Sequence, residues 1–138
     1  YYLNFAQNPE AEALAARENA GEARTMTDLS NIVREIALNN KIDESRDFAN
    51  FIQKAMFDGM RQTNSETRNL GVKQAPFMVL IGATMPSILA EISFITNKTE
   101  AGLLKTTGYR QEISEALLDG ITSYQKSLIK TKITLASN

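Results

Sequence analysis

The chain has 138 residues, a length typical of one domain, which argues against a two-domain enzyme. Hydrophobic residues make up 43% and charged residues 22%, with 7 Gly and 3 Pro, so the chain is expected to fold around a core. Its 15 basic and 16 acidic side chains leave a net charge of -1, which provides no general positive field and argues against nucleic acid as a partner.

The first 40 residues predict one strand and two helices. Residues 1–5 are aromatic and apolar, as at the end of a strand, and a proline suits the first turn of a helix over 9–20. A second helix is predicted from Thr27 or Asp28 to residue 40, because apolar side chains recur there at helical spacing. These side chains are predicted to be core: Leu29, Ile32, Val33, Ile36 and Ala37.

The middle of the chain predicts a longer helix and two strands. Asp43 is placed to cap the helix, whose apolar face consists of Phe48, Phe51, Ile52, Ala55, Met56 and Met60. Two apolar runs follow, residues 77–81 and residues 87–95. Both runs are short and rich in β-branched side chains, so both are predicted to be buried strands.

The last third predicts two helices. Asn97 and Glu100 resemble a capping box that opens a short helix to about Lys105. The final helix has one apolar face, formed by Tyr109, Ile113, Ala116, Leu117, Gly120, Ile121, Tyr124 and Leu128. Residues 129–138 are predicted to be a polar tail. Strands separated by helices predict an α/β layer fold in a single domain over 1–138, although two or three strands are too few for a complete doubly wound sheet.

Glu91 conflicts with this pattern because it interrupts the apolar run 87–95. A buried carboxylate is costly unless it is paired, hydrogen-bonded or bound to a metal. In one interpretation, strand alternation turns Glu91 to solvent at a sheet edge, or a basic side chain pairs with it. In the other, Glu91 lies at the carboxyl end of a strand, where α/β sheets place their sites, and serves as a general base. The spacing alone does not decide between them.

Several site types are excluded by the residues that the sequence does not contain. It has no Cys, and therefore no disulfide or thiolate ligand, and no His, so it cannot build an ordinary catalytic zinc site by itself. No apolar run approaches the roughly 20 residues that cross a bilayer, and no membrane span is expected. The sequence begins at Tyr1 without Met, so we expect a processed or truncated product.

Residues 85–97, Met-Pro-Ser-Ile-Leu-Ala-Glu-Ile-Ser-Phe-Ile-Thr-Asn, resemble the C-terminal signature of zinc-dependent N-acetylmuramoyl-L-alanine amidases. That signature is a proline, a small apolar strand, Glu, Phe and a Ser/Thr-Asn turn. Other segments resemble the family in the same order: 1–3, 15–20, 68–80 and 100–124. Asp28-Leu29-Ser30, leading into residues 42–45, is most similar to the cell-division branch of these amidases.

The resemblance implies a hydrolase that cleaves the amide between N-acetylmuramic acid and the L-alanine of the peptidoglycan stem peptide. It implies a three-layer, mostly parallel sheet flanked by helices, of which this chain is the C-terminal portion. The family holds zinc with two His and one Glu, all expected upstream of residue 1, so the isolated chain is expected to be inactive. Glu91 matches the catalytic glutamate, which takes a proton from the zinc-bound water and passes it to the leaving amine.

The resemblance also implies partners and a location. We expect the peptidoglycan stem peptide and glycan as partners, in the cell envelope, either periplasmic or secreted. Arg68 is a candidate for contact with the stem-peptide carboxylate or with Glu91, although an arginine in a polar loop is commonly solvated. In the cell-division branch a helical insertion occludes the zinc until an activator protein removes it. Here the corresponding interval, residues 21–27, is too short for such a helix, which leaves the activator in question.

A second hypothesis comes from a different class of protein. The chain could be a non-catalytic α/β binding or scaffold module that keeps the amidase fold without its metal. The zinc content of the full-length product distinguishes this module from the enzyme.

Overall fold

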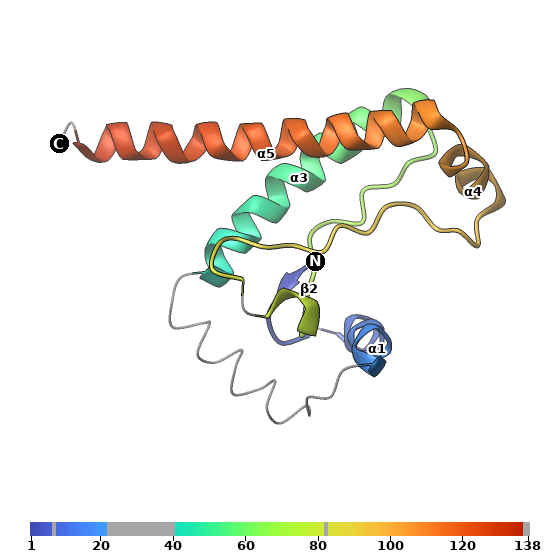
Figure 1. Ribbon diagram of the computed structural model, residues 1–138, viewed down its shortest axis with the longest axis horizontal. Coiled ribbons are helices and arrows are strands. Elements are labelled where there is room, and N and C mark those ends of the chain that lie inside the picture. The colour runs from blue at the N-terminus through green and yellow to red at the C-terminus, as the bar shows by residue number, and fades with distance from the viewer. Residues whose placement is uncertain (7, 22–40, 82, 137–138) are drawn as a thin grey trace. The chain divides into compact units, whose positions relative to one another are not determined.

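The computed structural model describes residues 1–6, 8–21, 41–81 and 83–136, with side chains up to residue 130 (Figure 1). The chain divides into two compact units, residues 1–49 with 71–90, and residues 50–70 with 91–138. The helix predicted from Thr27 or Asp28 to residue 40 lies outside the described residues. None of the helices in the described ranges combines the length and the apolar character needed to cross a bilayer.

A small parallel sheet lies in the first unit. Strand β1, Tyr2–Leu3, pairs with strand β2, Gln74–Ala75, with Tyr2 opposite Gln74 and Leu3 opposite Ala75. The strand predicted within residues 1–5 is therefore confirmed, although it is short. The Tyr2 hydroxyl donates a hydrogen bond to Oε1 of Gln74, which reinforces the register from the side chains.

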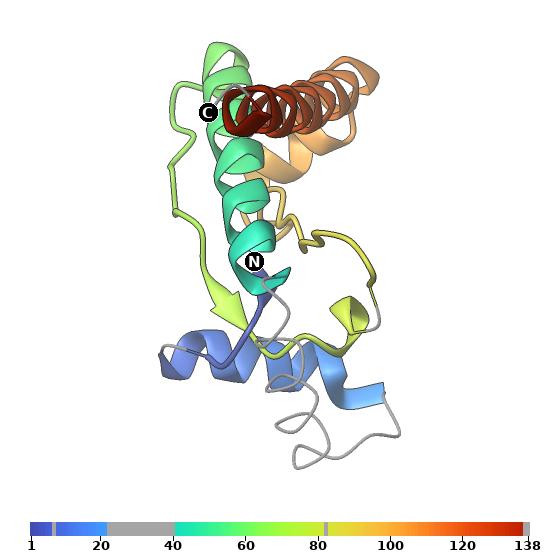
Figure 2. The same cartoon turned by 90° about the vertical axis from the view of Figure 1, so that its left-hand side faces the viewer.

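Helix α1, Pro9–Glu18, covers this sheet, as Figure 2 shows. Asn8 caps it by accepting a hydrogen bond from the Ala11 N–H at 2.9 Å, and the chain continues as the short 3-10 helix η1, Asn19–Gly21. The predicted helix over 9–20 is confirmed. Its buried alanines join the apolar side chains of both strands in one core: Leu3, Ala11, Ala15, Ala75, Phe77, Met78 and Leu80.

The predicted strand over residues 77–81 is wrong. Strand β2 ends at Ala75 because Pro76 has no N–H with which to continue the ladder, and Met78–Leu80 form the 3-10 helix η2. Asn19 fixes this turn from the end of α1: its side-chain N–H donates to the Pro76 carbonyl at 2.8 Å, and its oxygen accepts from the Met78 N–H at 2.9 Å. Phe77, Met78 and Leu80 are buried but Val79 is 72% exposed, so the predicted burial of the run is right only in part.

Helix α3 spans Lys41–Thr63 and contributes to both units. It begins before Asp43, so the prediction that Asp43 caps it is wrong. Asp43 instead lies in the first turn and forms an ion pair with Arg46 at 3.0 Å. Because a carboxylate in the first turn interacts favourably with the helix dipole, Asp43 still stabilises this end of the helix.

The second unit is helical. Helix α4 spans Lys98–Leu104 and helix α5 spans Thr107–Ala136, so residues 129–136 continue the helix and the predicted polar tail is wrong up to residue 136. Helix α5 crosses the later part of α3 (Figures 1 and 2). At the crossing, a Cβ on Gly120 would lie 2.9 Å from Cα of Ile52, so only a glycine allows the backbones to approach this closely. The adjacent core consists of Met60, Tyr109, Ile113 and Ala116.

Candidate functional site

Glu91 is exposed and lies outside any helix or strand. The prediction that residues 87–95 form a strand is wrong. Only Leu89 in this run has strand-like pairing, since its N–H donates to the Tyr1 carbonyl at 2.9 Å and its carbonyl accepts from the Tyr1 nitrogen at 2.8 Å. Because Glu91 is exposed, the desolvation cost of an ionised carboxylate inside an apolar strand does not arise.

A tight turn follows Glu91 and rules out an extended backbone to the end of the run. Ser93 has φ 65°, in the left-handed region that a residue with a side chain rarely adopts. The Asn97 N–H then donates to the Phe94 carbonyl at 2.9 Å, which closes the turn. The amino-acid sequence gives little sign of this turn, because serine stands where glycine would be the usual signal.

Asn97 ends this turn by capping α4, as predicted. Its side-chain oxygen accepts from the N–H groups of Thr99 at 3.0 Å and Glu100 at 3.3 Å. Glu100 departs from the expected capping box. Its carboxylate accepts from the N–H of Phe94 at 2.5 Å, three residues before the cap, rather than from the N–H of Asn97.

Arg68 lies exposed in the loop after α3. In the described part of the chain it forms no ion pair with Glu91, so the structure does not bring these two candidate residues together. Its position is that of a solvated loop arginine. A contact with a substrate carboxylate stays a prediction.

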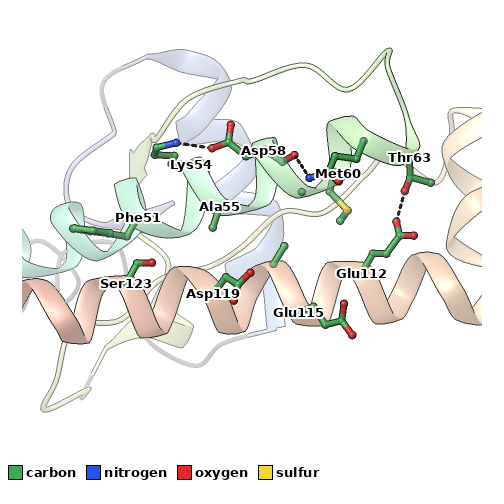
Figure 3. Close-up of a pocket in the computed structure, with 13 residues that line it drawn as sticks. Phe51, Lys54, Ala55, Asp58, Met60, Thr63, Glu112, Glu115, Asp119 and Ser123 are labelled. Atoms are coloured by element: carbon green, nitrogen blue, oxygen red, sulfur yellow. Dashed lines mark hydrogen bonds and ion pairs between the residues drawn. The ribbon is translucent and has the colours of Figure 1, made fainter.

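The described residues contain a depression of about 600 Å³ between α3 and α5 in the second unit (Figure 3). Its lining combines apolar side chains with four carboxylates: Asp58, Glu112, Glu115 and Asp119. Lys54 pairs with Asp58, and the Thr63 hydroxyl donates to Glu112. Neither Glu91 nor Arg68 lines this depression. The sequence does not predict it, because the apolar residues of both helices are at the spacing of core residues.

The residues that the structure describes do not fit an ordinary catalytic zinc site. The sequence has no His or Cys, and in the described ranges no three acidic side chains converge as metal ligands would.

The pKa of Tyr2, in the first unit, is raised above its usual value. Burial is the main cause, Arg46 lowers this pKa, and Asp43 raises it. Tyr2 therefore stays protonated at neutral pH and keeps its hydroxyl as a donor to Gln74.

Comparison with known proteins extends over most of the chain. The sequence profile of the family described as N-acetylmuramoyl-L-alanine amidase matches residues 5–123, a range that includes Arg68, Glu91 and Glu100. The chain is 35% identical over 126 residues to N-acetylmuramoyl-L-alanine amidase AmiA of Salmonella typhimurium, an alignment that covers 86% of this chain and 42% of AmiA.

Two proteins of Bacillus subtilis are also similar. N-acetylmuramoyl-L-alanine amidase LytC is 43% identical over 63 residues, covering 46% of this chain and 13% of LytC. The uncharacterized protein YqiI is 38% identical over 82 residues, covering 59% of this chain and 37% of YqiI. The chain thus spans less than half the length of each of these relatives. The profile match over residues 5–123 shows that the chain belongs to the N-acetylmuramoyl-L-alanine amidase family, which has an α/β fold.

Proposed function

We propose that the protein containing this chain hydrolyses the amide between N-acetylmuramic acid and L-alanine in peptidoglycan, in the cell envelope or outside the cell. The observation that carries the proposal is the family match over residues 5–123. AmiA and LytC, which align with this chain, are both named for this activity. We also place the two observed strands in a larger, mostly parallel sheet between two layers of helices, as the family resemblance implies.

Glu91 is the proposed general base. Its carboxylate accepts a proton from the attacking water while the water oxygen bonds to the carbonyl carbon of the amide. The carbon–nitrogen bond then breaks, and the same carboxyl returns the proton to the leaving amine of L-alanine. Two features support this assignment: the motif around Glu91 matches the family signature, and an exposed carboxylate is accessible to a polymeric substrate.

Zinc is the cofactor that the family resemblance implies, and it supplies an activated water in such enzymes. The ligands are proposed to lie outside these 138 residues, because the chain contains no His or Cys and its described acidic residues do not converge. By the same argument the chain alone is proposed to be inactive. The proposal includes no activator protein. The interval that bears on it, residues 21–27, lies mostly outside the described residues.

Arg68 is the proposed substrate-binding residue. Its guanidinium is exposed in a loop and is not used in an ion pair within the described residues. A bidentate contact with a stem-peptide carboxylate would suit such a group.

The test is Glu91→Gln in the intact protein. Glutamine keeps the shape of the side chain but does not accept a proton, so kcat for release of L-alanine peptides from purified peptidoglycan should fall on the order of a hundredfold or more. The matched control is Glu115→Gln, which changes an exposed carboxylate on α5 that accepts a hydrogen bond from Gln111 at 2.9 Å. The control should leave kcat unchanged.

Wild-type kcat in Glu91→Gln would remove Glu91 from the mechanism. Metal analysis of the intact protein distinguishes the enzyme from the non-catalytic module. About one zinc per chain, together with hydrolysis, supports the enzyme. The absence of both zinc and hydrolysis would support the non-catalytic module.

A further inference from the structure

We propose that Glu100 is a positioning residue that fixes the turn behind Glu91 and thereby aims the Glu91 carboxylate. The inference rests on the proposed function of Glu91. It begins from an unusual hydrogen bond: the Glu100 carboxylate accepts from the N–H of Phe94 at 2.5 Å, outside the helix in which Glu100 lies.

Helix capping alone does not account for this contact. A capping-box glutamate accepts from the N–H of its own cap residue, here Asn97. The Asn97 N–H is instead directed to the Phe94 carbonyl, and the first N–H groups of α4 are capped by the Asn97 side chain. One Glu100 carboxylate oxygen accepts from the Asn97 side-chain N–H at 3.4 Å, and the other holds the segment that leads back to Glu91.

Side-chain packing does not hold this segment in place. Phe94 is 59% exposed and Ile95 is 81% exposed, so neither anchors the turn in a core. Ser93 adopts φ 65°, a conformation that other contacts must maintain. The hydrogen bond to Glu100 acts on the next residue and is charge-assisted, so it is one of the stronger contacts available in this turn.

Helix α4 connects Glu100 to the core of the second unit. Leu103 and Leu104, on the same helix, pack against the cluster of Met60, Tyr109, Ile113 and Ala116. The sequence of contacts therefore runs from the core through α4 and Glu100 to Phe94, three residues after Glu91. A general base is effective only when it is held within hydrogen-bond reach of its proton, so loosening this turn should reduce kcat.

The test compares Glu100→Ala with Glu100→Gln in the intact protein. Glu100→Ala removes the acceptor and should lower kcat about 10-fold with little change in KM, because substrate contacts are intact while the base is misplaced. Hydrogen exchange of the Phe94 amide should become faster in the same variant. Glu100→Gln retains an acceptor oxygen and should restore most of kcat.

Asn97→Ala is the control for a merely structural effect. It removes the cap of α4 and the 3.4 Å hydrogen bond from the Asn97 side chain to Glu100, and it should lower the unfolding temperature. The hydrogen bond from the Phe94 N–H to Glu100 does not involve the Asn97 side chain, so the variant should preserve more of kcat than Glu100→Ala. If Glu100→Ala fails to fold, Ser93→Val replaces it. A β-branched side chain opposes a positive φ, so kcat should fall in the same way.

The outcomes separate the two proposals. Wild-type kcat and an unchanged Phe94 exchange rate in Glu100→Ala, with Glu91→Gln inactive, overturn the positioning by Glu100 and leave the function of Glu91 standing. Wild-type kcat in Glu91→Gln overturns both. A loss of kcat in Asn97→Ala equal to that in Glu100→Ala also contradicts the inference, because capping would then explain the effect.

Discussion

At the scale of single residues, the segment from Glu91 to Asn97 carries an exposed carboxylate on irregular backbone, followed by a strained turn. Ser93 is the residue that carries the strain, at φ 65°. For an L-residue, the left-handed region costs roughly 1–2 kcal/mol relative to the right-handed one. A serine is tolerated here because Phe94 and Asn97 are hydrogen-bonded on the far side of the turn.

Ser93→Gly should therefore stabilise the intact protein by about 1 kcal/mol, because glycine adopts positive φ without a Cβ clash. Urea unfolding monitored by circular dichroism measures the change. Ser114→Gly is the matched control, since Ser114 lies inside α5 and glycine there should destabilise by about 0.5–1 kcal/mol. A destabilising effect at both positions would show that the backbone at Ser93 is not left-handed in solution.

At the scale of elements, local signals predicted helices better than strands. The caps at Asn8 and Asn97 are local, and both helices that follow them were predicted from sequence. The strands predicted over 77–81 and 87–95 are wrong, because the conformation of these runs depends on distant partners. Asn19, for example, holds the turn at Pro76 from 57 positions away. Burial follows the apolar pattern for most of the first of these runs but not in the second, where Phe94 and Ile95 are exposed.

The candidate site shows the same division between local and distant information. Glu91 was found from a motif that is contiguous in sequence. The left-handed backbone at Ser93 and the hydrogen bond from the Phe94 N–H to Glu100 depend on backbone geometry. No residue pattern in this sequence predicts that geometry. The extension of α5 to Ala136 was missed for another reason: adding residues to an existing helix costs little, so a weak pattern suffices.

The crossing of α3 and α5 yields a prediction at this scale. A Cβ at Gly120 would lie 2.8 Å from Cδ1 and 2.9 Å from Cα of Ile52, and the backbone atom cannot move without shifting the helix. Gly120→Ala should therefore destabilise the protein by about 1–3 kcal/mol, despite the higher helix propensity of alanine. Thermal or urea unfolding measures the change.

Gly102→Ala in α4 is the control for Gly120→Ala. A Cβ at Gly102 meets no atom within 4 Å, so alanine there should stabilise the helix by up to about 1 kcal/mol. Equal effects at the two glycines would contradict close packing of the two helices.

At the scale of the whole molecule, the chain matches its family across residues 5–123 yet spans 42% of AmiA. The two compact units have separate apolar cores, one around Phe77 and one around Tyr109. The chain contains the proposed base, Glu91, but no imidazole or thiolate for a zinc site. The proposed chemistry therefore belongs to the intact protein.

The most direct test is to digest peptidoglycan with the intact protein in water enriched in oxygen-18 and to weigh the products by mass spectrometry. Amide hydrolysis transfers the oxygen of water to the acyl carbon, so the account predicts one heavy oxygen in the carboxyl group released on N-acetylmuramic acid and none in the L-alanine peptide. With Glu91→Gln this labelled product should be almost absent. Label at a sugar carbon or within the peptide chain, or undiminished labelling with Glu91→Gln, would contradict the account.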